Sequence, residues 1–216
     1  MSSTDAPALS LVTACKGGCG LTPEERATCS GLPAYRRADW RAGRLAARRA
    51  AATILGGVPA SRLSIRATAA GRPLVAIEGS TTKRGLLPVN VSISHRNGHG
   101  AAAADRRRRV GVDVEHRVEL PAAARSYFLS PSEERGSGLD GVTLWALKEA
   151  AWKALGCDSS TPFEDLELIF APDLVAIRLR SSVYPAHAKV LSAWSDHVVA
   201  RVWIDEGDVA GEEAAS

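Results

Sequence analysis

The chain has no long apolar run. Hydrophobic residues make up 45% of its 216 residues, yet no stretch approaches the ~20 consecutive apolar side chains that cross a bilayer. The N-terminal residues also lack a basic segment followed by an apolar stretch, so we expect no secretory signal. Cys15 follows Val-Thr-Ala as in a lipoprotein cleavage site, but the apolar stretch is short and Asp5 precedes it. We therefore expect a cytoplasmic protein that binds no membrane.

Aromatic residues are scarce as well, at 5%, so Ala, Leu and Val must fill the core. Cysteine occurs four times, at Cys15, Cys19, Cys29 and Cys157. Cys15 and Cys19 flank Lys-Gly-Gly, which a zinc site could use, but no clear fourth ligand lies near them in the sequence. Reduced thiols without a metal are the favoured interpretation.

The charge is small in total and unevenly placed. The net charge is only +3, but the basic residues gather in two segments, Arg36, Arg37, Arg41, Arg44, Arg48 and Arg49 in the first and Arg106–Arg109 in the second. Basic patches attract anionic partners, so a nucleic-acid-binding module is one alternative. The near-neutral total charge and the lack of interleaved aromatic residues argue against it.

Helix and strand patterns mix along the whole chain. Helices are expected to begin at Thr22-Pro23 and Ser130-Pro131 and to span residues 39–55, capped by Asp39, 122–128 and 142–155. Strands are expected at residues 9–14, 62–68, 74–77, 89–94, 100–104, 110–115, 166–170, 175–180, 189–194 and 198–204. Residues 100–104 and 110–115 are expected to pair as a hairpin. Without strict βαβ alternation, this order predicts an α+β fold. No internal repeat is evident.

Two carboxylates lie on one expected strand, in Gly-Val-Asp-Val-Glu at residues 111–115. Residues two apart point to the same side of a strand, so Asp113 and Glu115 face one place while Val112 and Val114 face the core. Like charges side by side are tolerated when they are exposed or when a cation lies between them. The segment therefore indicates either a solvated strand face or a metal site.

A third carboxylate lies on the expected helix 142–155. At helical spacing Glu149 and Lys153 share one face with Trp145 and Trp152, opposite an apolar face. The plain alternative is a surface i,i+4 ion pair worth ~0.3–0.5 kcal/mol. Two tryptophans beside the pair argue against a fully solvated face.

The strand near residue 91 ends in Ser94, His95 and Arg96, all donors that suit a phosphate oxygen. Adjacent strand residues point to opposite faces, so Ser94 and His95 are not expected to act as a nucleophile and its base.

Together and in this order, these motifs resemble the 4'-phosphopantetheinyl transferase superfamily, and specifically its longer surfactin-synthetase-activating (Sfp-like) type. Residues 111–115 are similar to the family's Gly-[Ile/Val]-Asp-[Ile/Val]-Glu, and residues 145–153 to its Trp-x-x-Lys-Glu-[Ser/Ala]-x-x-Lys. Weaker similarities lie in Val91–His95, Gly71-Arg72-Pro73, Trp40–Arg44 and Phe128–Glu133.

The resemblance implies two similar α/β halves in a pseudo-two-fold arrangement, with coenzyme A between them. Residues 1–109 would form the nucleotide-binding side, and residues 110–216 would carry the acidic motifs. Mg²⁺, or alternatively Mn²⁺, would be held by Asp113, Glu115 and Glu149. The nucleotide end of coenzyme A would be bound by Ser94, His95 and Arg72, with Arg44 and Arg26 as weaker candidates, and its phosphates by Lys153. Arg72 replaces the family's usual lysine, which keeps the charge but changes the donor geometry.

The implied reaction moves 4'-phosphopantetheine from coenzyme A to a serine of an acidic acyl or peptidyl carrier protein. Glu149 is the preferred general base, with Asp113 and Lys153 completing the catalytic set. The basic residues 36–49 could steer the carrier, although an ordinary solvated helix face explains them equally well. We expect a monomer that binds no nucleic acid. The remaining alternatives are a catalytically idle partner protein and another Mg-dependent phosphotransferase. Against the phosphotransferase, the sequence shows no glycine-rich phosphate loop of the usual kind.

Overall fold

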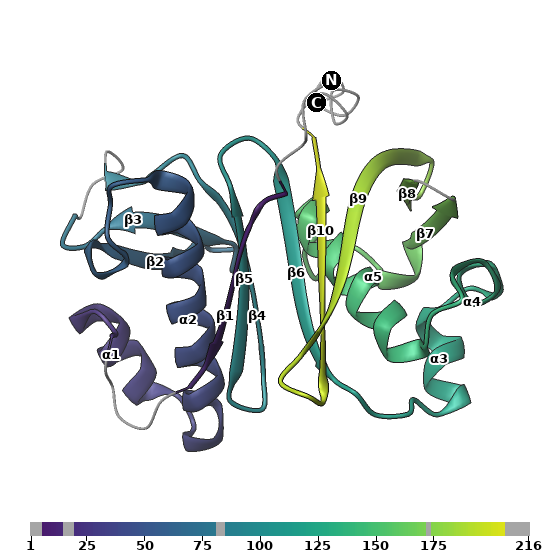
Figure 1. Ribbon diagram of the computed structural model, residues 1–216, viewed down its shortest axis with the longest axis horizontal. Helices are drawn as coiled ribbons and strands as arrows, with labels where there is room; N and C mark the ends of the chain where they lie inside the picture. The colour runs from purple at the N-terminus through teal and green to yellow at the C-terminus, as the bar shows by residue number, and fades with distance from the viewer. Residues whose placement is uncertain (1–5, 15–19, 81–84, 172–173, 206–216) are drawn as a thin grey trace. The chain divides into compact units, whose positions relative to one another are not determined.

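The structure, a computed structural model, describes residues 6–14, 20–80, 85–171 and 174–205 (Figure 1). It divides into two compact units, Met1–Arg108 and Arg109–Ser216. The described residues form five α-helices and three antiparallel sheets, which confirms the predicted α+β class. Within these ranges no helix has both the length and the apolar character needed to cross a membrane.

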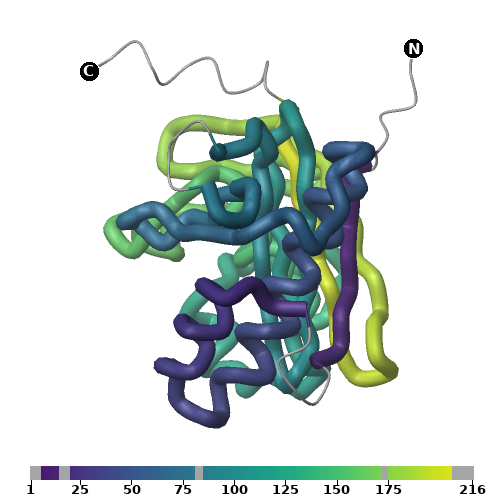
Figure 2. The backbone as a smooth tube through the Cα atoms, turned by 90° about the vertical axis from the view of Figure 1, so that its left-hand side faces the viewer, coloured from purple at the N-terminus to yellow at the C-terminus, as the bar shows by residue number. Residues whose placement is uncertain are grey.

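The first unit is a three-stranded sheet with a long helix on one face. Its elements are β1 (Ala8–Thr13), α1 (Pro23–Gly31), α2 (Ala34–Leu55), β2 (Leu63–Ala67), β3 (Pro73–Ile77), β4 (Asn90–Arg96) and β5 (His99–Asp105). The sheet order is β1-β5-β4, and β2 and β3 form a separate hairpin. α1 leads directly into α2, and Figure 2 shows this part of the chain in purple and blue. Alanines from α2 and β5 fill the helix–sheet interface, so the two elements pack closely.

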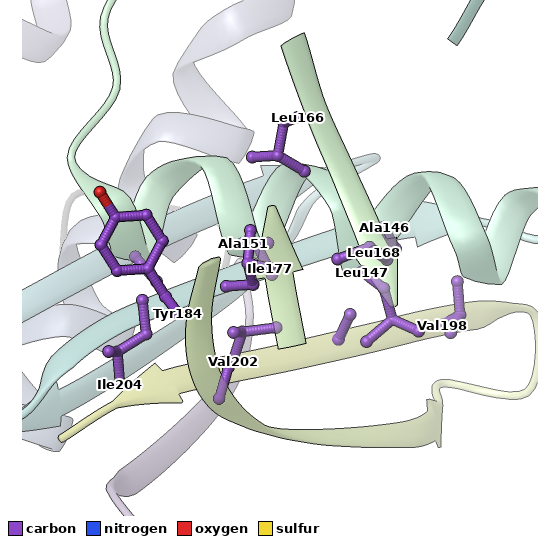
Figure 3. Close-up of a cluster of buried hydrophobic side chains, with 14 of the residues drawn as sticks. Ala146, Leu147, Ala151, Leu166, Leu168, Ile177, Tyr184, Val198, Val202 and Ile204 are labelled. Carbon is purple, nitrogen blue, oxygen red and sulfur yellow. The ribbon is translucent and has the colours of Figure 1, made fainter. Parts of the chain in front are cut away.

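The second unit is a five-stranded sheet in the order β6-β10-β9-β8-β7. Its elements are β6 (Arg109–His116), α3 (Ala122–Phe128), α4 (Pro131–Ser137), α5 (Gly141–Leu155), β7 (Leu166–Ala171), β8 (Leu174–Leu179), β9 (Ser182–Ala193) and β10 (His197–Ile204). α5 packs on β6 and β10, and its apolar residues meet side chains such as Leu166, Ile177 and Val198 in one core (Figure 3).

The two units repeat one topology. The first runs β1-α2-β2-β3-β4-β5 and the second β6-α5-β7-β8-β9-β10. In each unit the first strand pairs with the last, and the last pairs with the strand before it. The units differ in that β8 joins β9, whereas β2 and β3 form their own sheet. The two halves are therefore similar in topology; a pseudo-two-fold relation between them stays a prediction.

A buried glutamate in a capping box occurs at the same place in both units. In the first, Glu25 accepts a hydrogen bond from Thr22 N at 3.0 Å and pairs with Arg48 of α2 at 3.5 Å. Its second oxygen accepts from the backbone N of Ile65 in β2 at 3.4 Å. This side chain therefore joins the start of α1, the long helix and the first strand of the hairpin.

The second unit uses the same arrangement with one substitution. Glu133 accepts from Ser130 N at 2.7 Å, pairs with Lys148 of α5 at 3.0 Å and accepts from Leu168 N of β7 at 2.9 Å. Lysine thus stands on the helix where the first unit has arginine. The sequence analysis found no repeat, but the structure shows that Leu-Thr-Pro-Glu-Glu, from Leu21, and Leu-Ser-Pro-Ser-Glu, from Leu129, occupy equivalent places.

Two sequence predictions are wrong. Residues 100–104 and 110–115 do not pair as a hairpin, because β5 pairs with β1 and β4 while β6 pairs with β10. β4 and β5 instead turn through Asn97-Gly98, where both φ angles are positive, at 50° and 79°. Asp39 does not cap α2, which begins at Ala34; its carboxylate accepts a hydrogen bond from the backbone N of Gly98.

The predicted strand 189–194 is the end of the longer β9. Cys15 and Cys19, the zinc candidates, lie outside the described residues, so their interpretation stays a prediction. Cys29 is a buried free thiol in α1.

Candidate active site

Gly111 brings β6 into close contact with α5. A Cβ at this position would collide with the carbonyl oxygen of Ala150, so a larger residue would push the strand away from the helix. Asp113 and Glu115 lie on the same side of β6 as Gly111, because residues two apart share a face. Asp113 is only 2% exposed. Both carboxylates therefore lie on the face of the strand that the helix covers.

Val112 and Val114 are buried, as expected, but not in the core beneath α5. They lie on the opposite face of β6, outside the cluster that α5 forms with the sheet. The predicted burial of the valines is therefore confirmed, although they lie on the face of β6 that α5 does not cover. The strand is covered on both sides, so its valines signalled burial without telling which face meets the helix.

α5 is well defined at both ends. The side chain of Asp140 accepts a hydrogen bond from Thr143 N at 2.8 Å, and Gly156 ends the helix with φ of 75°. The expected span 142–155 is therefore confirmed to within one residue. This helix carries Glu149 and Lys153 one turn apart, on the side that meets β6.

Lys153 links the carboxylates of the two elements. Its Nζ lies 2.6 Å from Asp113 Oδ1 and 3.4 Å from Glu149 Oε2, and it also donates to the carbonyl oxygen of Val112 at 3.3 Å. The structure thus brings together three of the predicted site residues from two elements. One ammonium group is held among three oxygens.

The surroundings of this cluster raise the pKa values of both Glu149 and Lys153. Burial first, and then the negative charge of Asp113, raise the pKa of Glu149 to about 7. Burial would lower the pKa of Lys153, but Asp113 and Glu149 outweigh it and the pKa rises. Lys153 therefore stays charged, while Glu149 can exchange a proton near neutral pH, as a general base must.

Glu115 has a different partner. Its Oε1 accepts a hydrogen bond from Trp145 Nε1 at 3.3 Å. The Trp145 ring is itself fixed by Phe128 and Phe163, at centroid distances of 4.4 and 5.0 Å. The first residue of the Trp-x-x-Lys-Glu motif therefore orients a carboxylate of the Gly-Val-Asp-Val-Glu motif.

Asp113 and Glu149 suit a divalent cation, because their oxygens already surround the ammonium of Lys153. Mg²⁺ often takes only one or two protein carboxylates and fills its other positions with phosphate oxygens and water. Within the part of the chain that the structure describes, no group of three or more His, Cys, Asp or Glu side chains is arranged to hold a metal. The three-carboxylate set that includes Glu115 therefore stays a prediction.

The sequence analysis missed the burial of Lys148, the residue next to Glu149. Lys148 is 2% exposed, pairs with Glu133 and donates to the carbonyl oxygen of Phe128 at 2.6 Å. These contacts hold the middle turn of α5. The capping box at Ser130 was recognisable in the sequence, but the distant partner of its glutamate was not.

Ser94 and His95 lie near the end of β4, and their side chains point to opposite faces. The His95 ring packs on α2, where a Cβ on Gly43 would lie 3.0 Å from its Cδ2. The glycine of the Trp40–Arg44 motif therefore makes room for the histidine. Ser94, on the other face, is 9% exposed. Binding of the nucleotide by this pair stays a prediction.

The three candidate arginines of the first unit have different surroundings. Arg26 is exposed and donates to the carbonyl oxygen of Leu21 at 2.6 Å. Arg44 lies over the Trp40 ring at 4.8 Å, and burial lowers its pKa although Glu25 opposes the shift. Arg72 is exposed in the turn before β3. Binding of the nucleotide by these arginines stays a prediction.

The basic segment 36–49 does not form a single exposed surface. Arg48 is 4% exposed in its pair with Glu25, and Arg44 is half-buried. Arg37 is exposed but donates to the carbonyl oxygens of Leu32 and Ser30 at the end of α1. Several of these arginines therefore have structural contacts, and fewer remain to attract a partner.

Comparison with known families identifies residues 109–202 as a match to the 4'-phosphopantetheinyl transferase superfamily. The matched segment begins with β6 and ends within β10, so it includes both acidic motifs. The search of curated proteins returns no match. The second unit is therefore similar to this superfamily over most of its length, which supports a transferase.

Proposed function

Because residues 109–202 match the 4'-phosphopantetheinyl transferase superfamily, we propose that the chain moves 4'-phosphopantetheine from coenzyme A to a serine of an acyl or peptidyl carrier protein. The observation that carries the proposal is the contact of Lys153 with both Asp113 and Glu149, inside the matched segment. It joins the two acidic motifs in one place. We further propose the Sfp-like type, which the length of 216 residues and the repeated topology favour.

In the proposed reaction, the carrier serine oxygen attacks the phosphorus on the pantetheine side of the diphosphate. The new P–O bond replaces the bond to adenosine 3',5'-bisphosphate, which leaves. The serine proton goes to Glu149, whose pKa burial and Asp113 raise to about 7 in the metal-free protein. The proximity of Asp113 supports this role, because its charge raises the proton affinity of Glu149.

Lys153 would contact the diphosphate and stabilise the charge that develops on the leaving group. Asp113 and Glu149 would hold Mg²⁺ or Mn²⁺, with Glu115 as the third ligand, oriented by Trp145. When bound, the metal would neutralise the diphosphate and polarise its P–O bonds. Glu149 cannot be a full metal ligand and a free base at the same time. We therefore propose that it accepts the serine proton either directly or through a water molecule.

The nucleotide part of coenzyme A is assigned to the first unit. We propose Ser94, His95 and Arg72 as its main contacts, with Arg44 and Arg26 as weaker candidates. The exposure of Arg72 and Arg26 is compatible with an anionic ligand. Among the basic residues of α2, Arg36 and Arg49 are exposed and are the ones left to steer an acidic carrier protein.

The proposal is tested by the intact mass of apo carrier proteins after incubation with the chain, coenzyme A and Mg²⁺. A gain of one phosphopantetheine, lost when a chelator removes the metal, is the expected result. Carriers from fatty acid, polyketide and nonribosomal peptide synthesis are compared in parallel, which also identifies the partner. An unchanged mass for every carrier, while coenzyme A still binds, would favour an idle family member. Retention on heparin without coenzyme A binding would favour a nucleic-acid-binding protein.

A further inference from the structure

The ammonium group of Lys153 lies between the two carboxylates, where a divalent metal ion would bind. Its Nζ lies within 3.4 Å of two carboxylates and one carbonyl oxygen, from Asp113, Glu149 and Val112. An ammonium has three N–H donors and no acceptor, so these three oxygens match its hydrogen-bonding capacity. The side chain bearing it is only 26% exposed, and Asp113 is 2% exposed. The lysine therefore neutralises a largely buried acidic site without any ligand.

This arrangement works against the entry of a divalent ion. When both carboxyl groups are ionised, they and the ammonium together carry one net negative charge, whereas the two carboxylates alone would carry two. A metal ion beside the ammonium would also meet like-charge repulsion, which is little screened at a buried position. Metal binding between Asp113 and Glu149 therefore requires the Lys153 side chain to leave.

The surrounding structure allows the side chain to move while the backbone stays in place. α5 is held at its centre by the buried pair of Lys148 and Glu133, and Gly111 keeps β6 against the helix. Lysine has a flexible four-carbon stem, so its Nζ can change partner by rotations of the side chain alone. The diphosphate of coenzyme A would supply the new anionic partner.

We propose that Lys153 is an internal counter-ion that keeps the metal affinity of the free protein low and couples metal binding to coenzyme A binding. This inference rests on the proposed function and deepens it. With the diphosphate present, the ammonium pairs with phosphate oxygen and the carboxylates are released for the divalent ion. By thermodynamic linkage, coenzyme A and the metal then raise each other's affinity by the same factor.

Mn²⁺ is the probe for the test, because the electron paramagnetic resonance signal of the free ion measures the unbound fraction. Binding is measured with and without coenzyme A for the wild type, for Lys153→Met and for Lys189→Met. Lys189 is exposed on β9, so its replacement is the matched control for loss of one positive charge. A fourth variant, Asp113→Asn in the Lys153→Met background, locates the ion.

The wild type should bind Mn²⁺ at least about tenfold more tightly with coenzyme A than without it. Lys153→Met should bind the ion about tenfold more tightly than the wild type in the absence of coenzyme A, and coenzyme A should then add little. Lys189→Met should behave as the wild type. Adding Asp113→Asn should remove the gained affinity.

The inference would be overturned if, in the absence of coenzyme A, Lys153→Met bound Mn²⁺ no more tightly than the wild type. Thermal melting checks that the variant folds, and Lys153→Gln replaces it if it does not. A wild type whose Mn²⁺ affinity is equally high with and without coenzyme A would also overturn it. The two proposals fail differently: a wild type that modifies no carrier contradicts the proposed function, whereas an active wild type with an unchanged Lys153→Met affinity contradicts this inference alone.

Discussion

At the scale of the residue, the surroundings of Glu149 oppose its negative charge. Burial and the adjacent Asp113 raise its pKa from the ordinary 4.5 to about 7. Between these values the native chain binds a proton that the unfolded chain has released. The contribution of Glu149 to stability therefore falls as the pH rises through this window, and its full cost is present above pH 7. This instability is what a group kept for proton transfer is expected to show.

Glu149→Gln tests this cost. We expect the free energy of unfolding to rise by on the order of 1–2 kcal/mol above pH 7, with no gain below about pH 4.5, where the wild-type carboxyl is already protonated. Urea denaturation at the two pH values measures the difference. A gain of equal size at both would contradict the raised pKa. The same variant should lose transfer activity and retain coenzyme A binding.

Trp145 is the residue that orients Glu115. Trp145→Phe keeps an aromatic ring against Phe128 but removes the N–H that Glu115 accepts. We expect Mn²⁺ affinity in the presence of coenzyme A to fall about tenfold, the lower range for losing such a supporting hydrogen bond. Trp152→Phe is the matched control, since the buried Trp152 Nε1 donates no hydrogen bond within the described residues. Equal effects of both substitutions would contradict a specific role for Trp145.

At the scale of the element, each long helix forms a buried ion pair with the capping-box glutamate of its own unit. Lys148→Met leaves Glu133 buried without its cation, and Arg48→Met does the same to Glu25 in the first unit. We expect each substitution to lower the free energy of unfolding by about 3–5 kcal/mol. Calorimetry provides the measurement. Adding Glu133→Gln to Lys148→Met should restore part of the loss, and a further large loss would contradict the account.

Two members of the run Arg106–Arg109 also act at this scale. Arg106 donates to the carbonyl oxygens of Ile54 and Leu55 at 3.2 and 2.9 Å, and Arg109 lies 3.5 Å from the carbonyl oxygen of Leu155. Both long helices thus end near an arginine, where a positive charge is favourable. The run was visible in the sequence only as a basic segment, and its contacts with two helix ends were not predicted.

The elements themselves were largely predictable from sequence, and their pairing was not. α5 was recognisable because its apolar residues recur at helical spacing along one face. Pairing of β5 with β1 joins residues far apart in the chain, which local periodicity does not record. The Asn97-Gly98 turn was a usable hairpin signal, since both residues favour positive φ.

At the scale of the whole molecule, one topology occurs twice, but the acidic site is present only in the second unit. Counting from Arg48 and Lys148, the positions of Glu149 and Lys153 correspond to Arg49 and Thr53. Asp113 of β6 pairs with Ala200 of β10, and at the corresponding place in the first unit Ser10 of β1 pairs with Ala102 of β5. The residue equivalent to Asp113 is therefore a serine. The first unit keeps the capping-box pair and has no carboxylate at these positions.

This difference explains which parts of the site the sequence could predict. The acidic residues of the second unit were found because their types and spacing are uncommon and resemble a family motif. The contact of Lys153 with Asp113 was not found, because it depends on the approach of β6 to α5 that Gly111 permits. The burial of Lys148 depended likewise on a residue of another helix.

The central claim is that Asp113 and Glu149 hold a divalent ion against the diphosphate of coenzyme A. The most direct test is a crystal structure of the chain with coenzyme A and Mn²⁺, in which anomalous scattering locates the ion. We expect one peak within coordination distance of both carboxylates and of diphosphate oxygens, with Lys153 turned to a phosphate. Coenzyme A bound with no peak at these carboxylates, or with the ion elsewhere, would contradict the account.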